Sequence, residues 1–275
     1  MSAAHPPPKL RLGGMALGNG LLVHGPTHWA AAVRGRDGAI HIASGRKPRV
    51  RGVDRVPGAR GIARLGEAFA VIPLVKRALP EARLPFQDAG VLAVAAGAAA
   101  AGSALRRRAG GRLGGEAAAG AIAVVPALFA LRGGELASYH GVEHKAIAAY
   151  EQDTDDAADA AKEHDRCGSN LVAPMLAANV VGAMLMRRVL ERPGPVANAA
   201  VALSSAAAAV EVFAWSERHA ETRLARALRR PGYELQRAIG TREPDERQLE
   251  VGRAALQEIL RAEDAPPTAR PQQRP

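Results

Sequence analysis

The sequence predicts a mainly α-helical, multi-pass membrane protein of about four spans, with a small N-terminal β-containing segment and a C-terminal amphipathic helical region. Hydrophobic residues make up 48% of the 275 residues, but aromatic residues only 3%. So low an aromatic content disfavours a β-sandwich or barrel, because those folds depend on aromatic and β-branched pairs. Alanine-rich blocks favour helices instead, and four blocks contain no charged residue.

The net charge and the single cysteine bear on two questions: whether the chain binds nucleic acid, and whether it contains disulfide bonds. The 37 Lys and Arg against 27 Asp and Glu give a net charge of +10. A general bias toward Ala, Gly and Arg weakens this as evidence for a polyanion. The basic run Arg46–Arg60 also lacks aromatic residues that would stack on bases. We therefore expect no nucleic-acid partner. Cys167 is the single cysteine, which excludes an intramolecular disulfide framework and leaves a free thiol or a metal ligand.

The first predicted region covers residues 10–88, after a flexible tail at residues 1–9 in which we expect no secretory signal. Two apolar runs, Trp29–Val33 and Ala39–Ala43, flank Gly35-Arg36-Asp37-Gly38 and predict a β-hairpin. Residues 62–79 have apolar side chains at helical spacing, and Pro73 interrupts them. They predict an interfacial helix.

Residues 89–216 contain the four charge-free blocks. A membrane span needs about 17 to 25 residues, and two of the blocks are at or below that limit. A soluble, alanine-rich helical bundle is the alternative. The membrane interpretation is favoured because soluble helices show a polar face and because arginines stand at the block ends. The blocks are Ala89–Leu105, Ala117–Leu131, Gly168–Met186 and Pro193–Val210.

Residues 217–261 form the predicted C-terminal helical region. Residues 217–230 are basic and amphipathic, and residues 245–261 follow Pro244 with acidic residues in the first turn, as at the start of a helix. The Pro-rich residues 262–275 are expected to be disordered.

The chemistry-bearing segment is residues 138–170, between the second and third spans. His140-Gly141-Val142-Glu143-His144 has the order H-x-x-E-H. On a helix, positions i and i+4 share one face, so both imidazoles can reach one metal ion. This is the order of residues in the inverted zinc peptidases. Two histidines on a helix surface are the alternative.

A second donor pair follows the first. His164 and Cys167 form an H-x-x-C pair, a spacing that resembles the second half of a Cys/His zinc site. We therefore predict a divalent metal site, with Zn²⁺ as the ion. Glu151 lies seven residues after His144, on the same helical face, and is either a further metal ligand or a hydrogen-bond acceptor for one of the ligands. The predicted ligands are His140, His144, His164 and Cys167.

These residues resemble the core of the YqhQ-like bacterial proteins, which are membrane-associated proteins of unknown function and predicted metal-dependent enzymes. The chain departs from them at Asn19, where an acidic residue is usual, and at His24, where an arginine is usual. It also departs at Ser169-Asn170-Leu171. The segments that carry the resemblance are Tyr139–Lys145, Tyr150-Glu151 and His164–Gly168, with flanking matches at Gly13–Gly20, Gly25-Pro26, Leu235–Arg237, Thr241–Asp245 and Leu249–Val251.

Two functions remain open. If three residues bind the metal, water takes the fourth position and Glu143 serves as general base of a membrane hydrolase. If all four bind, the site is closed and the protein is non-enzymatic and acts through partners. We expect contact with membrane lipid, an unknown small-molecule or protein substrate, and a homo-oligomer or a membrane-protein partner.

The location follows from the number of spans. Four spans place the N-terminal region, residues 138–170 and the C-terminal region on one side of the cell membrane, which we expect to be cytoplasmic. The basic loops at Arg106–Arg112 and Arg187–Arg192 would then lie outside, against the positive-inside rule.

Overall fold

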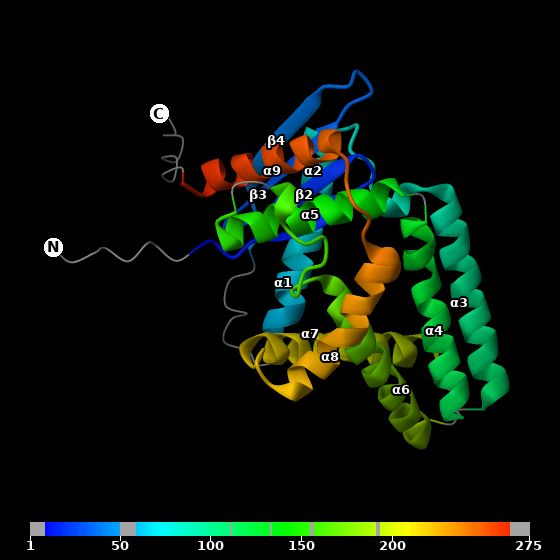
Figure 1. The fold of residues 1–275 in the computed structure, drawn as a ribbon. Coiled ribbons are helices and arrows are strands. Elements are labelled where there is room, and N and C mark those ends of the chain that lie inside the picture. Colours follow the sequence, from blue (N-terminus) through cyan, green and yellow to red (C-terminus); the bar gives the residue numbers. More distant parts are fainter. Residues whose placement is uncertain are drawn as a thin grey trace, which may run out of the picture.

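The computed structural model describes residues 9–49, 59–110, 112–132, 134–154, 157–190 and 193–264 (Figure 1). The tails predicted at residues 1–9 and 262–275 lie for the most part outside these residues, as does much of the basic run Arg46–Arg60.

The N-terminal region forms a four-stranded antiparallel sheet in the order β1-β2-β3-β4 (Figure 1). The predicted hairpin is confirmed, because β3 and β4 pair with Val33 opposite His41. Its turn contains Gly38 at a φ of 83°, which glycine adopts without strain. The strands are β1 (Gly13–Leu17), β2 (Gly20–His24), β3 (His28–Arg34) and β4 (Ile40–Arg46).

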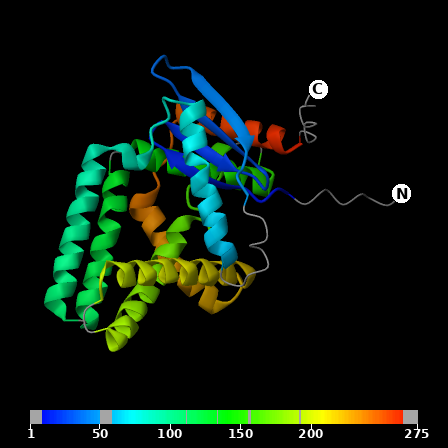
Figure 2. The ribbon, with the colours of Figure 1, turned by 180° about the vertical axis from the view of Figure 1, so that it is seen from behind.

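Helices cover both faces of the sheet (Figures 1 and 2). Successive residues of β3 point to opposite faces. Ala30 and Ala32 join a core with α5 (Glu135–Gln152) and α9 (Glu246–Asp264). Ala31 and Val33 join a second core with α2 (Ile72–Ala78) on the other face. The motif helix α5 therefore lies beside α9 on one face of the sheet, with α5 over β1 and β2 and α9 over β2, β3 and β4.

The predicted helix at residues 62–79 consists of two helices, α1 (Ala59–Ala70) and α2 (Ile72–Ala78). The break is at Val71, and Pro73 falls in the first turn of α2. Proline is tolerated there because the first turn leaves its backbone N–H groups unpaired in any case. A short 3-10 turn, η2 (Pro85–Gln87), then leads to the first long apolar helix.

The four predicted apolar helices are confirmed. Each is long and apolar enough to cross a membrane, with mean hydropathy of 1.4 to 1.6. Between 6% and 17% of each span is buried inside the protein, so most of its apolar surface needs an apolar surrounding. They are α3 (Ala89–Ala109), α4 (Leu113–Leu131), α6 (Val172–Val189), which continues the 3-10 turn η4 (Gly168–Leu171), and α7 (Pro195–Arg218).

The four helices do not form a parallel bundle. α3 and α4 lie side by side, whereas α7 lies across the part of the molecule away from the sheet (Figures 1 and 2). After α7, α8 (Arg223–Leu235) and a π-helical turn, η5 (Gln236–Gly240), return the chain to α5. The sheet, α5 and α9 pack together as one unit.

Candidate metal centre

The helix α5 places His140 and His144 on one face, as their spacing requires. Their ring centroids are 4.4 Å apart. The helix starts after Gly134, at a φ of 86°, and ends at Asp153, at a φ of 54°. Both conformations leave the right-handed helical region and so set the limits of the helix. Gly141 lets the chain at Arg242 approach closely, since a Cβ there would lie 2.3 Å from the Arg242 carbonyl oxygen.

Backbone carbonyls fix the orientation of both imidazoles. His140 Nδ1 donates to the Gly240 carbonyl at 2.8 Å, and His144 Nδ1 donates to the Lys162 carbonyl at 2.6 Å. A carbonyl only accepts, so each Nδ1 carries the proton and each Nε2 has a free lone pair. Histidine ligands of metals are oriented in this way. The π-helical turn η5 supplies the Gly240 carbonyl, and such turns are common at functional sites.

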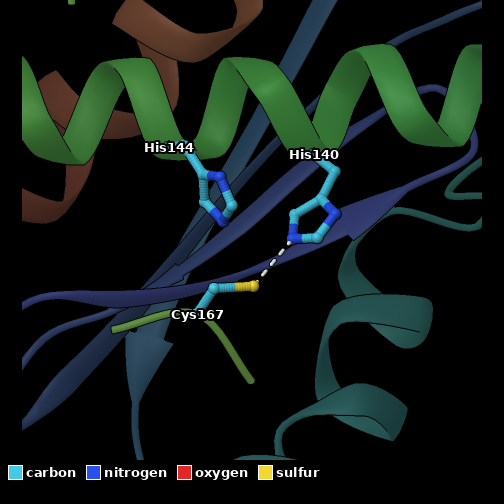
Figure 3. Close-up of side chains that lie close together, drawn as sticks. All are labelled: His140, His144 and Cys167. Atoms are coloured by element: carbon cyan, nitrogen blue, oxygen red, sulfur yellow. Dashed lines mark hydrogen bonds between the residues drawn. The ribbon is translucent and has the colours of Figure 1, made fainter. Parts of the chain in front are cut away.

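Cys167 completes a group of three donors. Its sulfur lies 3.3 Å from His140 Nε2, and the two histidines point from α5 toward it (Figure 3). The ligand atoms of His140, His144 and Cys167 all lie within 4.8 Å of one another. Burial raises the pKa of the Cys167 thiol to about 11, so the thiol donates to His140 Nε2.

The group fits a divalent metal ion. His144 Nε2 is buried and has no hydrogen-bond partner among the described residues. Burial lowers the pKa of His144 to about 2, so the ring is neutral and offers a lone pair. Two imidazole nitrogens and one sulfur are donors that zinc binds. A buried nitrogen without a partner is costly, and a metal ion would satisfy it.

His164 lies beside this group and not in it. Its ring centroid is 5.7 Å from that of His144. His164 Nδ1 accepts from the Arg166 backbone N–H at 3.2 Å, and Nε2 lies 3.3 Å from Glu151 Oε2. Glu151 also pairs with the Arg166 guanidinium. The structure thus brings together three of the four predicted ligands, and Glu151 serves as an acceptor for His164 and Arg166.

Glu143 lines the same cavity as the three donors, a space of about 420 Å³. Burial raises its pKa to about 6, against the opposing effect of His140. Its side chain packs on β1, where a Cβ at Gly14 would lie 2.6 Å from Glu143 Cγ. The position of the Glu143 side chain therefore requires a glycine at residue 14 of β1.

Two buried residues that the sequence did not single out hold the loop that brings Cys167 to α5. Lys145 is 3% exposed and donates to the carbonyls of Ala158 and Ala160, both at 2.8 Å. Gln236 is fully buried; its Oε1 accepts from the His164 backbone N–H at 2.8 Å, and its Nε2 donates to Ser169 Oγ at 2.9 Å. Lysine and glutamine are usually exposed, so only the packing identifies them.

Residues 135–262 match DUF1385, a family of proteins of unknown function. No curated protein and no solved structure matches the chain. The DUF1385 segment runs from the start of α5 to near the end of α9 and includes His140, Glu143, His144 and Cys167. Gly14, on which Glu143 packs, comes from the sheet, outside this segment.

Proposed function

We propose that the protein is a membrane metal-dependent hydrolase in which His140, His144 and Cys167 hold Zn²⁺ and Glu143 is the general base. The observation that carries the proposal is the convergence of three buried donors, one of them His144 Nε2 without a partner, on a cavity that Glu143 also lines. Zinc held by three protein donors keeps a position for water and lowers the pKa of that water to about 7.

Glu143 supplies the proton-transfer function. Glu143 precedes His144 directly in the chain. Because its side chain is buried, the charged carboxylate form is disfavoured. Such a carboxylate accepts a proton readily and returns it to a leaving group. His140 and His144 bind and orient, and the Gly240 and Lys162 carbonyls keep both Nε2 atoms unprotonated.

A closed, structural site is the second candidate. The His164 ring centroid is 5.7 Å from that of His144, so His164 is near enough to be a fourth ligand after a side-chain rotation. That rotation would break its contacts with Glu151 and Arg166. The three-donor site keeps these contacts and is therefore favoured.

The YqhQ-like membership is part of the proposal. The motif residues at Tyr139–Lys145 and His164–Gly168 lie inside the DUF1385 segment. Their resemblance supports a metal-dependent enzyme.

The substrate is proposed to come from the membrane. The cavity at the metal centre shares Pro85 and Leu136 with a larger cavity of about 730 Å³. Val91 in the first turn of α3 and Phe129 in the last turn of α4 line the larger cavity. Since both helices are candidate spans, an amphiphile could pass from the bilayer to the metal centre. The proposed location is the cell membrane, with the metal centre on the cytoplasmic side.

Metal analysis of the purified full-length protein, prepared without chelator, tests the shared premise. We expect about one zinc per chain in the wild type. His144→Ala should lose the metal, whereas His41→Ala, which removes a half-buried histidine of β4 outside the metal cavity, should retain it. A metal-free wild type would overturn both the catalytic and the structural reading.

Glu143→Gln separates the two candidates. In the zinc-loaded protein it should retain metal and fold but lose the hydrolysis of long-chain chromogenic esters. Glu234→Gln, an exposed change on α8 outside the linings of both cavities, is the charge-matched control and should retain this activity. Full activity in Glu143→Gln would exclude the base role and favour the structural site.

A further inference from the structure

A second charged cluster lies at the far end of the apolar helices. Glu116 on α4 is only 1% exposed. Its Oε2 lies 3.0 Å from Arg106 Nε on α3, and its Oε1 lies 3.2 Å from Arg187 Nε on α6. One carboxylate therefore joins three candidate spans.

The cluster carries an excess of positive charge. Arg106 Nη2 also donates to Asn179 Oδ1 at 3.3 Å, and Arg187 Nη2 donates to the Arg106 carbonyl at 3.2 Å. A guanidinium has five N–H donors, so both arginines keep donors for another acceptor. Two cations against Glu116 leave one unit of positive charge, and ionisable groups inside spans are functional by default.

These side chains line a cavity of about 290 Å³. Its polar part comprises Arg106, Arg187, Glu116, Asn179 and Asn198, and apolar walls continue along the helices. The walls include Met175, Leu176 and Val201. A polar end at the helix termini with apolar walls suits an amphiphile with an anionic head.

The sequence segments that contain the cavity-lining arginines are strongly basic. Such clusters beside spans attract anionic lipid head groups. In the sequence, residues 103–116 and 183–194 contain only two acidic residues, Glu116 and Glu191. Their arginines are Arg106, Arg107, Arg108, Arg112, Arg187, Arg188 and Arg192.

We propose that this cavity binds the phosphate head group of an anionic phospholipid in the leaflet opposite the metal centre. Helical rise of about 1.5 Å per residue places Glu116 roughly 20 Å along α4 from Leu131, which borders the metal cavity. The site is therefore separate from the proposed hydrolase site and does not depend on it. The apolar walls favour a phospholipid over free inorganic phosphate, although both ligands would present a phosphate group to the arginines.

Native mass spectrometry of the full-length protein in detergent tests the proposal, with phosphatidylglycerol, phosphatidylcholine and inorganic phosphate as separate arms. We expect phosphatidylglycerol to bind at least about tenfold more tightly than phosphatidylcholine, equivalent to about 1.4 kcal/mol. Inorganic phosphate should not bind measurably at micromolar concentration. Equal binding of the two lipids would overturn the proposal, and tight binding of free phosphate would exclude the lipid.

Two variants with opposite expected effects locate the binding in the cavity. Arg187→Gln leaves Arg106 and Glu116 as a balanced pair and should weaken phosphatidylglycerol binding about tenfold. Glu116→Gln removes the competing carboxylate and should strengthen it. Arg188→Gln makes the same charge change at an exposed neighbour outside the cavity lining and should leave it within about twofold.

The pattern of losses distinguishes a pocket from diffuse attraction. Equal losses in Arg187→Gln and Arg188→Gln would mean that only the overall charge matters, and would overturn the site. If Glu116→Gln also weakened binding, the cluster would serve only to join the helices. Because the two cavity variants are expected to change binding in opposite directions, loss of folding cannot imitate the predicted result.

Discussion

A methyl group added at Gly14 tests the position of Glu143 without changing Glu143 itself. The three atoms nearest to a Cβ at Gly14 are all in Glu143: Cγ at 2.6 Å, and Cδ and Oε1 at 2.7 Å. A Cβ at the neighbouring Gly13 would meet no heavy atom within 4 Å apart from those of its own chain neighbours. Gly13→Ala is therefore a matched control in the same strand.

The magnitude follows from these distances. Carbon atoms in contact are about 3.5–4.0 Å apart, so in Gly14→Ala either Glu143 or the strand must move by roughly 1 Å. Overpacking of this kind costs about 1–3 kcal/mol of stability. A 1 Å displacement of a catalytic group costs roughly a hundredfold in rate. The metal content should not change, because the nearest atoms belong to no metal ligand.

The assay combines three measurements on the full-length protein in detergent: thermal unfolding by circular dichroism, zinc content and hydrolysis of long-chain esters. Gly14→Ala should lower the unfolding temperature and the rate but retain zinc, and Gly13→Ala should match the wild type. If the two variants behaved alike, Glu143 would not pack on β1 as described. If Gly14→Ala lost zinc, the metal site and the Glu143 site would not be separable.

Three further predictions concern the support of the metal centre. Lys145→Met should weaken zinc binding about 10–100-fold, because the loop that carries the Lys162 carbonyl loses its anchor. Lys162→Met keeps that carbonyl and should leave zinc binding unchanged. Competition with a zinc indicator measures both affinities. His164→Ala should retain stoichiometric zinc by elemental analysis, and loss of the metal would instead support a four-ligand, closed site. Gly141→Ala should unfold at a clearly lower temperature than the wild type, because its Cβ would lie 2.3 Å from the Arg242 carbonyl oxygen. Overpacking of this kind costs about 1–3 kcal/mol of stability. An unchanged unfolding temperature would contradict the close approach of α5 to the chain at Arg242.

The features that depend on local periodicity were predictable from the amino-acid order alone. The spacing of His140 and His144 places both on one helix face, whatever the helix packs against. The charge-free blocks predicted the four long apolar helices, because length and composition suffice for that inference. The hairpin at Gly35–Gly38 was also predictable, since turn residues there interrupt two apolar runs.

Which donors meet depends on packing between segments that are distant in the chain. His164 and Cys167 have equal standing in the sequence, yet Cys167 faces His140 and His144 while His164 faces Glu151 and Arg166. The choice depends on the path of the loop that Lys145 and Gln236 hold. Those contacts join residues far apart in the chain, and a periodic pattern carries no information about them.

The same limit applies to the groups around the donors. The carbonyls of Gly240 and Lys162 orient the two imidazoles, but every residue has a carbonyl, so no sequence pattern marks these two. Gly14 is needed because Glu143 packs on it across the contact between β1 and α5. The residue types determine which side chains can bind a metal, and packing between distant segments selects those that meet and the direction in which they point.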